Sequence, residues 1–162
     1  MNHQAAQSLL LTLALCATTT QFAAAVSIAP AADASVNPTN PALNFGALGT
    51  INVGPLAPGG AAGNTGLLLF QGTSLPAGLT SANIVKATLT VYVNRVLVAG
   101  ALDFAELSSA WTENSVTFNT RPSSFPAFAL NVPVNGAGYV PVDVTNVVKR
   151  LVEEHNPISA FK

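Results

Sequence analysis

The segment that decides the fold reads Ala87-Thr88-Leu89-Thr90-Val91-Tyr92-Val93-Asn94. Apolar and polar side chains alternate along it. One face would carry Leu89, Val91 and Val93, and the other would carry Thr88, Thr90, Tyr92 and Asn94. Successive side chains of an extended chain point to opposite faces of a sheet, so this period of two predicts a strand with one face in a hydrophobic core.

Short apolar segments lie on both sides of this strand, separated by many of the chain's 11 prolines and 12 glycines. That spacing is typical of short strands joined by tight turns. We expect further strands at residues 50–53, 66–70, 102–107, 115–119 and 138–142, the second buried on both faces because it reads GLLLF. Residues 54–64 are rich in glycine and proline, which predicts a loop.

One short helix is expected after these strands, with Asp143 or Thr145 as its N-cap and its end near Asn156. Its apolar stripe would consist of Val147, Val148, Leu151 and Val152. The whole pattern predicts an all-β protein, an antiparallel β-sandwich of jelly-roll type with one short helix in the C-terminal region. A β-solenoid would need a fixed repeat, and the sequence has none.

Composition favours one globular domain, because 49% of the 162 residues are hydrophobic and 8% are charged. The formal net charge is −1, and no lysine or arginine precedes Lys86. A basic stripe that could neutralise a phosphate backbone is therefore missing, and we expect no nucleic-acid partner.

The first 25 residues have the layout of a secretory signal peptide. An apolar run from Leu9 to Leu15 precedes Phe22-Ala23-Ala24-Ala25, which offers an Ala-x-Ala cleavage site, although the usual basic residue near the start is missing. The run is shorter than the roughly 20 residues that span a bilayer. We therefore expect residues 1–25 to be removed and residues 26–162 to form one secreted domain without a membrane span. A hydrophobic N-terminal anchor or a mis-assigned start codon is the alternative.

Cysteine chemistry is not expected in the mature domain, because the chain's one cysteine, Cys16, lies within the predicted signal. Leu15 precedes it where a lipoprotein signal would have a small residue. The domain must then be held by its core or by a bound ion, without a disulfide.

Catalytic groups are sparse in the predicted domain. His155 is its one histidine, and no nucleophile elbow, phosphate-binding loop or zinc-type spacing occurs. Three acidic residues cluster near expected strands, namely Asp103, Glu106 and Glu113. Since Asp103 and Glu106 are three positions apart, they would lie on opposite faces of a strand, which disfavours the carboxylate pair of a glycoside hydrolase. We expect no enzymatic activity.

A structural calcium ion is the one cofactor that the sequence leaves open. Side-chain oxygens that could serve as ligands occur in one stretch, at Asp33, Asn37, Asn40 and Asn44. The same residue types are common turn formers, and their spacing does not distinguish the two roles.

Sugar-binding sites place an aromatic ring against the apolar face of a pyranose and polar groups beside its hydroxyls. Tyr92 lies on the predicted outer face of its strand, with Asn94 and Arg95 next to it. These three residues are the candidate carbohydrate-binding site. The alternative is that Tyr92 packs against a second sheet or lies on a solvated strand face without a ligand.

Several segments, in the right order, resemble the DNRLRE family of bacterial and archaeal extracellular domains, which is grouped with carbohydrate-binding module family 96. The most specific runs from Trp111-Thr112-Glu113 through Val116-Thr117-Phe118-Asn119 to Pro122, and is similar to the family pattern W-x-E-x-x-V-T-[WFY]-N-x-x-P. Further similar segments lie at residues 32–36, 44–46, 52–54, 67–70, 75–78, 84–93 and 142–148. The resemblance implies that Trp111, Glu113 and Pro122 build the fold.

The resemblance implies a non-catalytic β-sandwich of secreted or cell-surface proteins, in a family that often accompanies polysaccharide-degrading modules and includes members that bind acidic polysaccharides. We therefore expect a secreted polysaccharide-binding module. The alternative is a structural, adhesion or spacer domain without sugar affinity, and a lyase or hydrolase is a third reading that the missing catalytic groups disfavour.

Two departures from the family pattern stand out. Gln71 follows Phe70 where the family has an aspartate, and residues 156–162 resemble the start of a late strand after which family members carry at least one more. The resemblance thus implies that the final strand is missing and the domain is C-terminally truncated. We expect an open sheet edge that a partner strand or module covers, and marginal stability.

Overall fold

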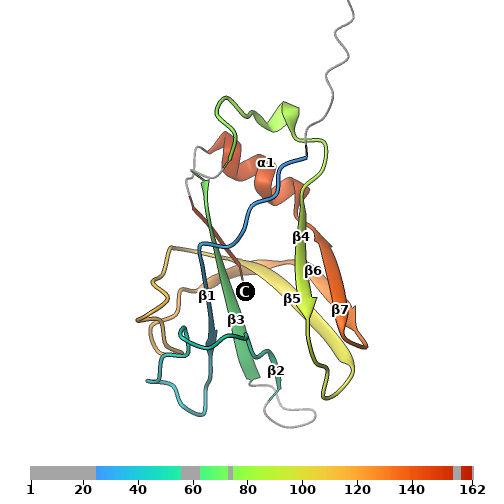
Figure 1. The fold of residues 1–162 in the computed structure, drawn as a ribbon. Helices are drawn as coiled ribbons and strands as arrows, with labels where there is room; N and C mark the ends of the chain where they lie inside the picture. Colours follow the sequence, from blue (N-terminus) through green and yellow to red (C-terminus); the bar gives the residue numbers. More distant parts are fainter. Residues whose placement is uncertain (1–24, 56–62, 73–74, 155–157, 162) are drawn as a thin grey trace, which may run out of the picture.

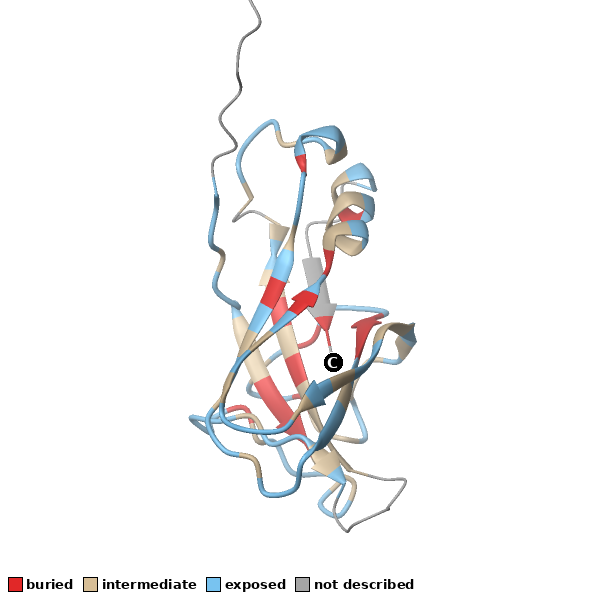
Figure 2. Ribbon diagram, turned by 90° about the vertical axis from the view of Figure 1, so that its right-hand side faces the viewer, coloured by how far each residue is buried: buried red, intermediate tan, exposed pale blue. Residues whose placement is uncertain are grey.

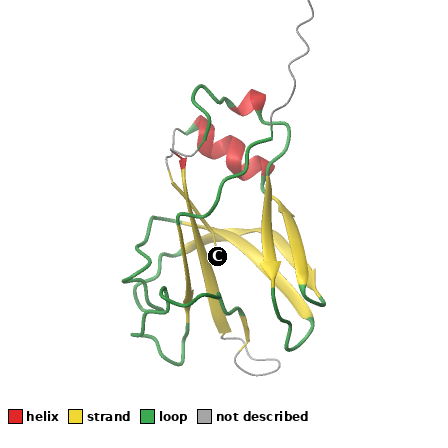
Figure 3. Cartoon of the chain, viewed as in Figure 1, coloured by secondary structure: helices red, strands yellow, loops and turns green. Residues whose placement is uncertain are grey.

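The computed structural model describes residues 25–55, 63–72, 75–154 and 158–161. The predicted signal peptide, apart from Ala25, and His155 lie outside the described residues. Strands dominate the fold (Figures 1 and 3). The elements are β1 (Ala32–Val36), β2 (Gly54–Pro55), β3 (Gly63–Gln71), the short 3-10 helix η2 (Ser81–Asn83), β4 (Thr88–Val93), β5 (Gly100–Leu107), β6 (Ser124–Val134), β7 (Gly138–Asp143), α1 (Thr145–Glu153) and β8 (Ile158–Phe161).

The strands form two antiparallel sheets. The larger has the order β1-β3-β8-β5-β6, with β2 paired to one end of β3, and the smaller is a ribbon of β4 and β7. Apolar side chains of the ribbon pack against those of the larger sheet. The predicted all-β antiparallel sandwich with one short α-helix is therefore confirmed. A strand beyond β8 stays a prediction.

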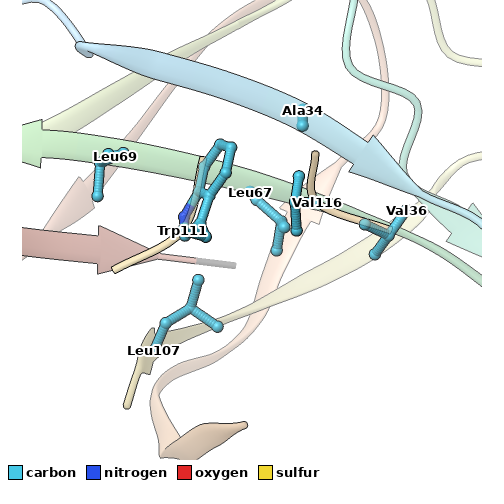
Figure 4. Packing of buried hydrophobic residues seen from close by; sticks show 7 residues of the cluster. All are labelled: Ala34, Val36, Leu67, Leu69, Leu107, Trp111 and Val116. Carbon is cyan, nitrogen blue, oxygen red and sulfur yellow. The ribbon is translucent and has the colours of Figure 1, made fainter. Parts of the chain in front are cut away.

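Two hydrophobic clusters cover the two faces of the larger sheet. Figure 2 shows that the buried residues lie mainly on the strands. The first core consists of Ala34, Val36, Leu67, Leu69, Leu107, Trp111 and Val116 (Figure 4). The second core lies between the sheets and centres on Leu89, Phe104, Val142 and Val144. In β3, Leu67 and Leu69 are buried in the first core while Leu68 and Phe70 are partly buried against the second. The strand thus has apolar contacts on both faces, as predicted, but is fully buried on one.

The alternation in β4 is confirmed as well. Leu89 is buried and Val91 packs against the second core, whereas Thr88, Thr90 and Tyr92 are exposed. The ribbon therefore has an apolar inner face and a polar, aromatic outer face.

The strand predicted at residues 50–53 is wrong. This segment crosses the face of β3 instead of pairing with it, since a Cβ atom added to Gly66 would lie 2.6 Å from Ile51 Cγ2 and 2.9 Å from Val53 Cγ1. The N–H of Asn52 donates to Ser35 Oγ at 2.7 Å. The apolar residues at 51 and 53 thus pack over a glycine, which a strand pattern cannot reveal. The loop predicted at residues 54–64 is also too long, because β2 and β3 include its two ends.

The strand predicted at residues 115–119 is wrong too. Local hydrogen bonds form turns there, with the N–H of Val116 donating to Thr112 O at 2.9 Å and that of Thr120 to Thr117 O at 3.2 Å. Val116 is buried because the loop covers the first core.

Strand β6, by contrast, was not predicted, since Pro126 and Pro133 interrupt its pattern. Both prolines are tolerated because β6 lies at the edge of the sheet.

The predicted helix is present, but it begins at Thr145 with Val144 as its N-cap residue, so neither Asp143 nor Thr145 is the cap. Asp143 Oδ1 accepts the N–H of Thr145 at 2.8 Å, and Thr145 Oγ1 accepts the N–H of Ala87 at 3.0 Å. The two residues proposed as N-caps thus bond at the helix entry without either occupying the cap position. None of the helices in the described ranges is long and apolar enough to cross a membrane.

Candidate functional site

The outer face of the β4–β7 ribbon gathers three cross-strand pairs. In the antiparallel register Thr88 is opposite Asp143, Thr90 is opposite Pro141, and Tyr92 is opposite Tyr139. Directly opposed residues point to the same side of a sheet. All six are exposed, and we call them the outer ribbon face.

The aromatic end of this face is formed by both tyrosines of the chain. Their ring centroids are 5.0 Å apart and the ring planes are tilted by 58°. Tyr92 keeps 61% and Tyr139 75% of its surface exposed, so neither ring contributes to a core. Two adjacent exposed rings form an apolar surface in a polar setting, as a carbohydrate platform requires.

The predicted site residues are thus partly brought together. Tyr92 faces outward as predicted, and Asn94 and Arg95 are exposed directly after the end of β4. Sequence reasoning missed Tyr139. The alternation of Tyr139 and Pro141 with Val140 and Val142 was a signal for an outward side chain, but the register that sets it beside Tyr92 was not predictable.

The opposite end of the outer ribbon face is polar. Hydrogen bonds from Thr145 lower the pKa of the Asp143 carboxyl below its usual range, and the positive charge of Lys86 lowers it further. Asp143 is therefore ionised at neutral pH. A hollow of about 720 Å³ adjoins this end. It is lined by Lys86 and Asp143 together with Phe128 and the start of α1.

Two of the four residues considered for calcium use their side-chain oxygens in turns. Asn37 Oδ1 accepts the N–H of Thr39 at 2.7 Å, and Asn44 Oδ1 accepts the N–H of Gly46 at 3.3 Å. Asp33 is a partly buried residue of β1, and Asn40 lies in an exposed turn. Within the described ranges, no group of three or more His, Cys, Asp or Glu side chains could hold a metal ion.

The acidic residues considered for hydrolysis serve separate parts of the fold. Asp103 Oδ1 accepts the N–H of Asn131 in β6 at 2.8 Å, and Glu106 forms an ion pair with Arg150 of α1. The backbone oxygen of Glu113 accepts a hydrogen bond from Asn44 at 2.7 Å. The carboxylates of Asp103 and Glu106 are thus engaged with two different elements, β6 and α1.

A comparison with protein-family models matches residues 24–161 to carbohydrate-binding module family 96. The chain belongs to carbohydrate-binding module family 96. A search of curated proteins gave no match. The family 96 resemblance inferred from the Trp111–Pro122 segment is confirmed, and the burial of Trp111 in the first core fits the fold-building role that the resemblance implies.

Proposed function

We propose that this family 96 module binds polysaccharide through the outer ribbon face, as a non-catalytic domain of a secreted protein. The family supports a carbohydrate ligand. The exposed pair of Tyr92 and Tyr139 is the observation that carries the location. Stacking of a pyranose ring on either tyrosine would remove apolar surface from water on both partners.

The shape of the face suits an extended sugar chain. Six residues of β4 span about 17 Å at roughly 3.4 Å per residue, so a chain lying along the ribbon would pass from the tyrosines to the polar end. The hydroxyls of Thr88 and Thr90 and the carboxylate of Asp143 lie along this path and could bond sugar hydroxyls.

Charge at the aromatic end favours an acidic polysaccharide. Arg95 follows this end of β4, whereas at the polar end the carboxylate of Asp143 offsets the charge of Lys86. A guanidinium pairs with a sugar carboxylate more strongly than with a neutral hydroxyl. We further propose that Asn37 and Asn44 act as turn formers rather than as calcium ligands, because their side-chain oxygens accept backbone N–H groups.

The test is titration calorimetry of the protein against neutral and uronate-containing polysaccharides, with calcium and with a chelator. Tyr92→Ala and Tyr139→Ala should each weaken binding about tenfold or more, equivalent to about 1.4 kcal/mol. Arg95→Ala should weaken binding to the acidic polymer more than to the neutral one. Phe125→Ala removes a ring on β6 that is 53% exposed and is the matched control, expected to leave affinity unchanged.

Several outcomes would contradict the proposal. Saturable binding that survives both tyrosine substitutions would place the site elsewhere. Absence of binding by the folded protein would favour a spacer or adhesion domain, and release of reducing ends or unsaturated products would reveal an enzyme. Secretion is checked separately, by whether the exported protein begins at Val26 in mass spectrometry.

A further inference from the structure

The hollow beside the polar end of the outer ribbon face is built from three parts of the fold. Its volume of about 720 Å³ lies within the range of roughly 300–1,000 Å³ that small-ligand pockets occupy. Phe128 comes from β6, residues 143–147 form the junction of β7 with α1, and Val85 and Lys86 precede β4. Figure 1 shows the start of α1 next to the start of β4. We call this site the junction hollow.

Aromatic and aliphatic side chains form the apolar part of its lining. Phe128 is only partly buried against the second core, and its ring packs on that of Phe161 in an edge-on contact with centroids 5.8 Å apart. Val85 keeps 82% of its surface exposed. An aromatic ring held in place beside exposed aliphatic groups suits the C–H face of a pyranose.

Polar groups in the same lining are available to a ligand. The Lys86 ammonium and the side-chain amide of Asn146 form no hydrogen bond or ion pair with any described residue. The Asp143 carboxylate accepts the N–H of Thr145 and can accept further bonds, because each carboxylate oxygen has more than one lone pair. The hollow therefore offers donors and acceptors side by side, as sugar hydroxyls require.

The charges of the junction hollow cancel. Lys86 and Asp143 are the two charged residues among those that line it, and they have opposite signs. A uronate or a phosphate would gain little there, because the Asp143 carboxylate would repel it. An uncharged sugar loses nothing from this arrangement and can bond to both groups. The junction hollow thus differs from the aromatic end of the face, where Arg95 is the nearby charge.

We infer that the junction hollow is a second sugar subsite, which takes an uncharged pyranose residue of the same polysaccharide whose acidic residues meet Arg95. This inference rests on the proposed function, because it extends the path of that ligand. Thr88 and Tyr92 are four residues apart on β4, or about 14 Å. The ligand is therefore an extended heteropolysaccharide that contains both uronate and uncharged residues, and a short oligosaccharide occupies one subsite at a time.

The first test is nuclear magnetic resonance of the ¹⁵N-labelled protein with small sugars. The probes are cellobiose, mannobiose and galactobiose, and the charged comparisons are digalacturonate and inorganic phosphate. We expect at least one neutral disaccharide to shift the amide resonances of Lys86 and of residues 143–147 saturably. Digalacturonate should bind these amides at least about fivefold more weakly, because of the repulsion by Asp143.

Two exposed residues of the hollow supply the variants. Lys86→Ala and Asn146→Ala should each weaken the neutral disaccharide at least about fivefold, since each removes hydrogen-bonding groups without touching a core. Lys149→Ala is the matched control, because Lys149 lies on α1 but does not line the hollow. The dispersion of each spectrum shows at the same time whether the variant is folded.

Ligand length gives the second test. Calorimetry with mixed oligosaccharides of increasing length should show a rise in affinity of about tenfold or more once one chain reaches both subsites. Asn146→Ala should remove this rise, and so should Tyr92→Ala. Lys149→Ala should keep it.

Two results would overturn the inference. One is a response of the hollow amides to phosphate or digalacturonate but to none of the neutral disaccharides, which would reveal an anion site. The other is polysaccharide binding that depends on Tyr92 but not on Lys86 or Asn146, which would leave the proposed function intact. By contrast, disaccharide binding in the hollow together with polymer binding that ignores both tyrosines would support the subsite and contradict the location of the proposed function.

Discussion

Asn44 shows how much one side chain contributes to the loops that cover the first core. Its Nδ2 donates to Glu113 O and to Val116 O, both at 2.7 Å, across 69 and 72 residues of sequence. Next to it, a Cβ atom added to Gly46 would lie 2.2 Å from Glu113 O. The sequence indicated that Asn44 is a calcium ligand or a turn former. Its hydrogen bonds to Glu113 and Val116 could not be predicted, because these residues are distant in the sequence.

Asn44→Asp should destabilise the protein by about 1–3 kcal/mol, because it removes both donors and sets a carboxylate against two carbonyl oxygens. Urea unfolding at pH 7 measures the change. Asn40→Asp, in an exposed turn nearby, is the control and should stay within about 0.5 kcal/mol of the wild type. Equal effects of the two substitutions would show that the hydrogen bonds of Asn44 contribute little.

At the scale of elements, helix α1 joins the ribbon to the larger sheet. Thr145 Oγ1 accepts the N–H of Ala87 just before β4, and Asp143 at the end of β7 bonds the first residue of the helix. Arg150 then pairs with Glu106 of β5 and with Glu154 on the helix itself. The helix thus contacts both sheets through polar groups at two points.

Asp143 should make stability depend on pH in the acid range. Its folded pKa is lowered below 3.8, so the ionised carboxylate stabilises the folded state above the unfolded pKa, and this stabilisation is lost as pH falls through the folded value. We expect Asp143→Asn to be less stable than the wild type at pH 7, with the difference shrinking between pH 4 and 2. Urea unfolding across this pH range measures the difference in unfolding free energy between the two proteins. A difference that does not change with pH would contradict the stabilising role of the Asp143 carboxylate.

Arg150→Ala should cost about 1–3 kcal/mol. The side chain of Glu106 is only 10% exposed and would lose its cation, but Arg150 is 44% exposed, which reduces the effect below that of a fully buried pair. Glu154→Ala removes the other partner of Arg150, which is 49% exposed, and should cost no more than about 0.5 kcal/mol. A larger loss of unfolding free energy for Glu154→Ala than for Arg150→Ala would show that the ion pair with Glu106 does not dominate the contribution of Arg150.

At the scale of the whole molecule, one sheet separates two small cores. Among the residues whose burial is described, the largest fully buried side chains are Leu67 and Val36, both in the first core. Burial of little apolar surface gives little stability.

We therefore expect a thermal unfolding midpoint below about 60 °C for the protein alone, near the upper end for mesophile domains. Circular dichroism at two scan rates would measure it and reveal irreversibility. A cooperative transition well above that temperature would mean that the two cores stabilise the fold more than their size suggests.

Sequence patterns predicted the elements whose residues face a core at a regular period. Leu89, Val91 and Val93 revealed β4, and Leu67 to Phe70 revealed β3. They failed where distant segments decide the structure. Ile51 and Val53 pack over Gly66 without pairing, Val116 enters the core from a turn, and the prolines of β6 are acceptable only because it is an edge. In the candidate site, the direction of Tyr92 followed from its period, whereas Tyr139 required the strand register.

The placement of the aromatic residues has a practical consequence. Both tyrosines lie on the outer ribbon face, and the one tryptophan lies in the first core. A reagent that modifies exposed phenols would therefore attach to this face through either ring, without a cysteine having to be introduced. Fluorotyrosine incorporation would likewise give two fluorine resonances that both report on the same 5.0 Å contact. In this chain, a reagent or isotope that labels tyrosine therefore labels the outer ribbon face.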